Sequence, residues 1–203
     1  MVDLGPATEN DMVLAFLRAE INSSRYDDRI IRALGQLGYT RCLLDEPNLA
    51  NRTENRARKR LLNFRGYETR EALFAGFPSD AVWRKVTLEQ HDFSTLRYAN
   101  HKTWNDLSDG TRLVSVGARN FRERPDDPET YQINGILEAL RNGARFPELI
   151  AAQHNDSDGL ILIEGHSRAT AYVMERVFEG VEVFVASSRL MPDGHSIRVA
   201  GVY

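Results

Sequence analysis

The chain has 203 residues, of which 42% are hydrophobic and 27% are charged, a composition that is ordinary for a globular protein. The formal net charge of −3 excludes polyanion binding by bulk charge, so any contact with nucleic acid must come from a local basic patch. The single cysteine, Cys42, excludes an internal disulfide, and no apolar run is long enough to cross a membrane. Because the N-terminus also lacks the pattern of a secretory signal, we expect a cytoplasmic protein without a membrane partner.

The N-terminal region has the apolar spacing of a set of helices. Two runs at helical spacing lie within residues 9–38, and the polar residues 22–24 separate them. Residues 48–70 predict a third helix, which ends near Gly66. We therefore interpret residues 1–80 as a helical N-terminal extension.

The third predicted helix is strongly basic. Residues 48–70 contain seven Lys or Arg and two acids, a local charge of +5. Arg52, Arg56 and Lys59 fall on one face, roughly opposite to the apolar face. Such a stripe can bind nucleic-acid phosphates, but it can also be only the solvated face of a helix. Because no aromatic residues alternate with the arginines, base stacking is not indicated.

The rest of the chain alternates between strands and helices. Strands are predicted at 81–89, 147–153, 159–164 and 181–187, and helices at 128–143 and 166–178. Residues 103–121 are ambiguous, because Gly110 and Gly117 weaken an otherwise helical pattern. The alternation predicts an α+β fold, in which residues 81–203 form a second domain.

The most informative segment is "LILIEGHSRATAY", residues 160–172, in which a buried strand runs into a helix. A helix N-terminus carries unpaired N–H groups and a partial positive charge, so anions bind there readily. Gly165 would let a ligand approach the backbone, and Arg168, which we expect to be partly exposed, would clamp a phosphate. Ser167 would donate a hydrogen bond, and His166 would become a cation beside an anion. The junction therefore predicts a phosphate site at these four residues.

The same junction also fits a simpler interpretation. Glycines are common where a strand runs into a helix, and Ser167 could only cap the helix. Glu164 could only interact with the helix dipole.

Other candidate sites are weaker. His91 and Asp92 lack the spacing of metal ligands. Trp104 is interpreted as a core residue rather than as a surface on which a base would stack. Neither feature changes the expected location of the site.

Together with the segment before it, the junction resembles the ParB/sulfiredoxin-like superfamily. The sequence "LRNGARFPELIAA" at 140–152 matches a helix that ends in glycine before a proline-led strand, and residues 160–172 supply a Gly-x-x-Arg box that opens the next helix. In that superfamily, which includes CTP-binding ParB proteins, ATP-using sulfiredoxins and free-serine kinases, the box holds nucleotide phosphates. The resemblance implies a ParB/sulfiredoxin-like mixed-sheet core over residues 82–187, preceded by the helical extension.

The resemblance extends to individual residues of the box. Gly165 and Arg168 match its fixed ends. His166 stands where sulfiredoxins have a catalytic cysteine, which disfavours sulfinic-acid reduction, and Ser167 stands where ParB proteins have an arginine. The nearest pattern is the acid-Gly-His-His-Arg box of free-serine kinases, in which Glu164 takes the place of the acid. The resemblance then implies that Glu164 is a Mg²⁺ ligand or catalytic base, and that His166 is a second catalytic residue.

These patterns predict a nucleotide-binding protein. The leading interpretation is a phosphotransferase or nucleotide hydrolase that uses ATP or CTP with Mg²⁺ and an unidentified small-molecule acceptor. One alternative is a nucleotide-gated DNA-binding module, in which the basic helix of residues 52–70 contacts DNA. The other is a degenerate binding protein that kept the fold and lost the chemistry.

Overall fold

One mixed sheet of five strands organises the molecule, in a computed structural model that describes residues 1–23, 26–69, 74, 77–123, 131–154 and 159–191. The strands are β1 (Val2–Ala7), β2 (Val82–Thr87), β3 (Leu149–His154), β4 (Ile161–Glu164) and β5 (Glu182–Ser188). Their order across the sheet is β1-β2-β5-β3-β4. β3 and β5 run parallel, and the other neighbouring strands are antiparallel.

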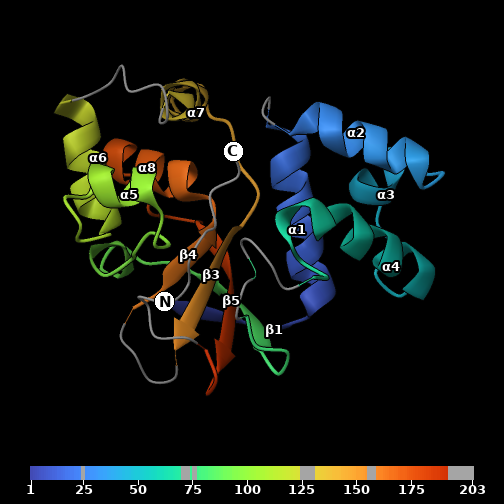
Figure 1. The fold of residues 1–203 in the computed structure, drawn as a ribbon. Helices are drawn as coiled ribbons and strands as arrows, with labels where there is room; N and C mark the ends of the chain where they lie inside the picture. The colour runs from blue at the N-terminus through green and yellow to red at the C-terminus, as the bar shows by residue number, and fades with distance from the viewer. Residues whose placement is uncertain (24–25, 70–73, 75–76, 124–130, 155–158, 192–203) are drawn as a thin grey trace.

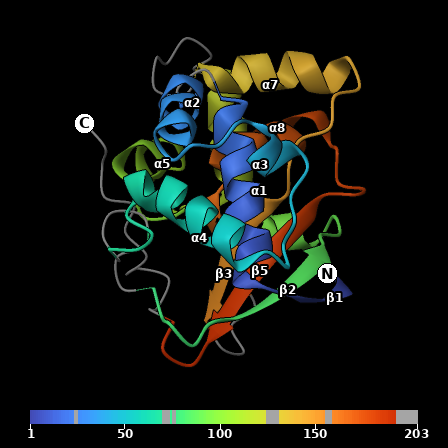
Figure 2. The ribbon, with the colours of Figure 1, turned by 90° about the vertical axis from the view of Figure 1, so that its right-hand side faces the viewer.

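Helices lie on both sides of the sheet (Figure 1). One layer contains α1 (Glu9–Ile21), α2 (Asp27–Gln36), α3 (Cys42–Asp45) and α4 (Arg52–Leu61). The other contains α5 (Lys102–Leu107), α6 (Val114–Glu123), α7 (Gln132–Arg141) and α8 (His166–Glu175). Figure 2 looks onto the first layer and shows α1 and α4 in front of the strands. Helices combined with a mixed sheet confirm the predicted α+β class.

Each layer of helices has a hydrophobic core against its own face of the sheet. Phe16 of α1 belongs to one core together with Trp83 of β2 and Phe184 of β5. Tyr172 of α8 belongs to the second, together with Val183 of β5. The helices of residues 1–80 and the sheet of residues 81–203 therefore pack directly against each other.

The sequence pattern did not predict β1, the edge strand that pairs with β2. Gly5 and Pro6 lower strand propensity, and proline has no N–H with which to bond a neighbouring strand, so this segment suits only an edge. The pairing is irregular between Asp3 and Gly5, where Gly5 has φ of 115°. The N-terminal region is therefore helical only from Glu9 onward, because its first residues belong to the sheet.

α4 is shorter than the helix predicted for residues 48–70. The side chain of Asn51 accepts a hydrogen bond from the N–H of Thr53 at 3.0 Å, which caps the helix at its start. At the other end the chain tightens into a 3₁₀ turn, Leu62–Arg65. Gly66, with φ of 77°, then ends the helical segment as predicted.

The ambiguous segment 103–121 contains two helices rather than one. The turn between α5 and α6 includes Asp109 and Arg112, which both have positive φ. For the helix predicted at 128–143, the described part begins at Gln132, and its expected first turn lies outside the described residues. Within the ranges that the structure describes, no helix is both long and apolar enough to cross a bilayer.

Candidate functional site

The predicted turn between β4 and α8 has a backbone that requires glycine. Gly165 lies between Glu164 and the first residue of α8 and has φ of 94°. A Cβ atom at this position would lie 2.4 Å from Cδ2 of Leu149 and 3.1 Å from Nη2 of Arg168. The space above the glycine, expected to admit a ligand, is therefore filled by two side chains of the protein itself.

Arg168 is buried, with 6% of its surface exposed, so the expectation of a partly exposed arginine is wrong. Its Nη1 donates to the carbonyl oxygens of Pro147 and, at 3.2 Å, of Glu148. Its Nη2 donates to Oε1 of Glu164 at 3.1 Å. The guanidinium group thus links the first turn of α8 by hydrogen bonds to Pro147 and Glu148, which precede β3, and to Glu164 at the end of β4. In this conformation Arg168 does not present its fork to a ligand.

Glu164 is the most accessible charged group of the turn. Its side chain is 19% exposed, and Oε1 accepts the bond from Arg168. A carboxylate with one oxygen bound and part of its surface in solvent retains acceptor capacity for a cation or a proton. The geometry is therefore compatible with the predicted role as a Mg²⁺ ligand or base.

His166 is buried, and its imidazole is held in the neutral form. Nε2 accepts a hydrogen bond from the backbone N–H of Ala99 at 3.3 Å. Burial lowers the pKa of His166 to about 4; Glu164 opposes this shift, whereas His101, Arg65 and Arg168 add to it. His166 is therefore neutral in the ligand-free protein, because solvent is excluded from its ring; the expected cation was one beside a bound anion.

We expect this buried histidine to make the protein less stable in acid. The unfolded imidazole, with an ordinary pKa near 6.5, binds a proton as the pH falls, whereas the folded one resists protonation until about pH 4. His166 should therefore contribute full stability above pH 6.5 and cost about 2 kcal/mol of unfolding free energy between about pH 7 and pH 5. Urea unfolding of wild type and His166→Asn at both pH values measures this loss.

The exposed His91 provides the control, because its side chain is 73% exposed. His91→Asn should retain the acid sensitivity of the wild type, and His166→Asn should lose most of it. Equal acid sensitivity in wild type and His166→Asn would contradict the assigned protonation of His166.

Ser167 joins α8 to the neighbouring helix α7. Its Oγ accepts a hydrogen bond from Nε2 of Gln132 at 2.7 Å, which leaves its own proton for another acceptor. His166, Ser167 and Arg168 are each less than a tenth exposed. A phosphate can therefore reach the first turn of α8 only if some of the surrounding side chains or segments move.

The structure adds an aromatic group to this site that sequence reasoning missed. The rings of Tyr98 and Trp104 stack at 4.9 Å between centroids, and Trp104 stacks on His166 at 5.2 Å. The segment that carries them, "RYANHKTW", contains two large aromatic residues, but it lies more than 60 residues before the turn. Only the tertiary fold shows that this segment faces His166.

Two of the three residues predicted for the basic stripe are exposed, and the third, Lys59, is not. Arg52 and Arg56 of α4 are exposed, but Lys59 is half-buried and its Nζ lies 2.5 Å from Oε2 of Glu9 on α1. Arg60 is exposed as well and was not predicted as part of the stripe. α4 belongs to the helical layer on the far side of the sheet from α8 (Figure 1), so the stripe and the turn are separate candidate sites.

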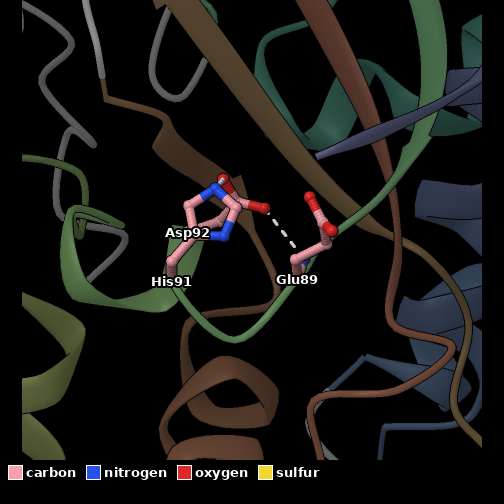
Figure 3. A group of neighbouring side chains, drawn as sticks. All are labelled: Glu89, His91 and Asp92. Atoms are coloured by element: carbon pink, nitrogen blue, oxygen red, sulfur yellow. Dashed lines mark hydrogen bonds and ion pairs between the residues drawn. The ribbon is translucent and has the colours of Figure 1, made fainter.

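His91 and Asp92, dismissed as metal ligands on spacing, lie in one local turn with Glu89 (Figure 3). The ligand atoms of Glu89, His91 and Asp92 lie within 4.8 Å of one another. The N-terminal ammonium of Met1 lies 2.8 Å from a carboxylate oxygen of both Glu89 and Asp92. Asp92 also accepts the backbone N–H of Glu89, so these carboxylates already have partners within the chain.

Comparison of the chain with protein-family models, curated proteins and solved structures finds no significant match.

Proposed function

We propose that this chain is a nucleotide-binding protein with a ParB/sulfiredoxin-like core that transfers or hydrolyses a phosphate of ATP or CTP in the presence of Mg²⁺. The observation that carries the proposal is the turn after β4, where a left-handed glycine opens a ten-residue helix directly behind an acid. The first N–H groups of such a helix have no partner inside it, and its dipole favours an anion. Once the side chains that cover the first turn of α8 move aside, the phosphates would lie against the N–H groups of Ser167 and Arg168.

The charges around the turn support an anionic ligand. Arg65 and Arg168 both lower the pKa of His166, so both contribute positive potential at the first turn of α8. Arg65 comes from the 3₁₀ turn after α4, where its Nε lies 3.1 Å from Oε1 of Glu20. The negative charge of Glu164 has the opposite effect and raises the pKa of His166. The same negative charge would repel a phosphate, and a Mg²⁺ ion bound to Glu164 would remove this repulsion.

We infer from these contacts roles that differ from those of an exposed arginine clamp. Arg168 holds Glu164 in place, and Glu164 binds Mg²⁺ or takes the proton of the attacking group. His166 is a neutral donor, because its Nε2 is already an acceptor for Ala99. Ser167 donates its hydroxyl proton to a phosphate oxygen. Positioning and electrostatic stabilisation then supply most of the catalysis, as is usual for phosphoryl transfer.

Calorimetry and melting curves with ATP, ADP, CTP and GTP, with and without Mg²⁺, test the proposal, followed by assays of phosphate release for each nucleotide that binds. We expect saturable binding of a triphosphate and Mg²⁺-dependent release of phosphate. Binding without release would leave the degenerate binding protein as the function. No binding of any nucleotide would overturn the proposal.

The second candidate function is a DNA contact through α4. Arg52, Arg56 and Arg60 are exposed at intervals of four residues, which places them about 6 Å apart along the helix. Spacing of this kind can follow a phosphate backbone, and each phosphate contact releases counterions. The exposure of these three arginines is the specific observation that favours this function.

We expect replacement of the three exposed arginines by glutamine to reduce the dependence of any DNA affinity on salt. If all three contact phosphates, the slope of log affinity against log salt should fall by about 3. Lys59→Gln is the matched control, because Lys59 pairs with Glu9 and should change the slope little. An unchanged slope in the triple variant would leave the stripe as a solvated helix face.

A further inference from the structure

The segment of Arg97, Tyr98 and Ala99 lies along the outer edge of β4 and extends to the first turn of α8. Arg97 forms bridges with Ile161 of β4 and with Leu113. The N–H of Tyr98 donates to the carbonyl of Arg112 at 2.7 Å. This pairing on both sides fixes the backbone of Tyr98 and Ala99 beside His166.

The hydroxyl of Tyr98 is linked to the backbone of His166 through Thr170. Thr170 donates its single hydroxyl proton to the carbonyl oxygen of His166, at 2.8 Å. The 2.6 Å bond between the hydroxyls of Tyr98 and Thr170 must therefore have Tyr98 as the donor. Tyr98 and Thr170 are fully buried, so water cannot replace either bond.

The same segment controls the imidazole ring. Because Nε2 accepts the N–H of Ala99, the single proton of the neutral ring must lie on Nδ1. The stack of Tyr98, Trp104 and His166 holds the plane of the ring, with 12° between the planes of Trp104 and His166. One segment therefore fixes the position, the plane and the tautomer of His166.

Gly117 of α6 provides the space for the Tyr98 ring. A Cβ atom at Gly117 would lie 2.4 Å from the hydroxyl oxygen of Tyr98 and 2.7 Å from its Cε2. Inside a helix, glycine is less favourable than alanine. The close approach of Tyr98 gives a physical reason for the presence of glycine at this position.

We propose that Tyr98, accommodated by Gly117, is the positioning residue that holds His166 as a neutral hydrogen-bond donor, with its proton on Nδ1, at the first turn of α8. The role of this donor toward a ligand rests on the proposed function. The positioning itself is a property of the free protein and can be measured without a ligand.

The test compares two glycine-to-alanine substitutions inside helices. Gly117→Ala pushes against the Tyr98 ring, whereas Gly135→Ala in α7 meets nothing within 4 Å. Imidazole ¹⁵N NMR should show the Nδ1–H tautomer of His166 in wild type and Gly135→Ala. Gly117→Ala should show mixed tautomers, because a displaced ring no longer keeps Nε2 beside the N–H of Ala99. A folded Gly117→Ala with the wild-type tautomer would overturn the proposal.

Tyr98→Phe keeps the test decisive if Gly117→Ala does not fold. Loss of the hydroxyl should speed hydrogen exchange of the α8 first-turn amides about tenfold, because the bond to Thr170 is absent. Tyr172→Phe is the matched control. It removes the hydroxyl of a tyrosine on α8 itself, without removing a hydrogen bond to the first turn of α8. Equal exchange rates in the two variants would overturn the proposal.

Nucleotide titration of the same proteins separates this inference from the proposed function. If wild type binds no nucleotide but Gly117→Ala still changes the tautomer of His166, the positioning role holds and the proposed function fails. If wild type binds nucleotide and the tautomer is unchanged in Gly117→Ala, the positioning role fails alone.

Discussion

Replacing Arg168 by alanine should destabilise the protein by about 3 kcal/mol, rather than only weaken ligand binding. The substitution leaves Glu164 without its cation and leaves the carbonyls of Pro147 and Glu148 without their donor. Removing one partner of a buried ion pair costs about 3–5 kcal/mol, and the 19% exposure of Glu164 places this case at the lower end. Urea unfolding at neutral pH measures the loss.

Arg141→Ala is the matched control for this prediction. Arg141 also pairs with a glutamate on α8, Glu175, at 2.7 Å, but its side chain is 64% exposed. Solvent screens such a pair, so the unfolding midpoint should change little. If Arg168→Ala and Arg141→Ala unfold at the same urea concentration as wild type, the structural role assigned to Arg168 is wrong.

Replacing Glu164 by glutamine should lower nucleotide turnover by about 100-fold and leave the protein folded. Glutamine keeps the size of the side chain and an oxygen that can accept the bond from Arg168. It carries no charge for Mg²⁺ and cannot serve as a base, and loss of general-base help is worth about 10²–10⁴-fold in rate. Nucleotide without metal should still bind, at least as tightly as to wild type, because the substitution removes a negative charge beside the phosphates. Single-turnover phosphate transfer, recorded beside melting curves, measures both effects.

Glu175→Gln serves as the control at the other end of α8. Glu175 also pairs with an arginine and is partly buried, but it lies beyond the first turn. Its replacement should leave turnover unchanged. Near-normal turnover in a folded Glu164→Gln protein would mean that Glu164 only holds Arg168 and interacts with the helix dipole.

The sequence predicted the elements whose signals are local. The apolar run of β4, the glycine after it and the spacing of α8 could be found because each depends on neighbouring residues. β1 could not, because Gly5 and Pro6 argue against a strand until a partner edge is known. The end of the helical segment at Gly66 was predicted, but the start of α4 was not, because it depends on the cap formed by the side chain of one residue, Asn51.

The charge states and partners of Arg168 and His166 could not be predicted from the residues next to them in sequence. The carbonyls that hold Arg168 lie about 20 residues away in sequence, and the aromatic rings around His166 lie more than 60 away. Local reasoning therefore suggested a partly exposed arginine and a histidine that becomes a cation beside an anion. In the structure, Arg168 is buried and bonded to Glu164 and to two carbonyls, and His166 is buried and neutral. Desolvation disfavours an unpaired charge in both cases.

The most direct test of the central claim is to locate a bound nucleotide at the start of α8. In ¹⁵N-labelled protein titrated with ATP or CTP and Mg²⁺, the backbone amides of Ser167 and Arg168 should shift saturably, by more than those of Arg52 and Arg56. Such shifts would place the phosphates at the helix N-terminus. Saturating nucleotide that leaves the amides of the α8 first turn unmoved would contradict the account.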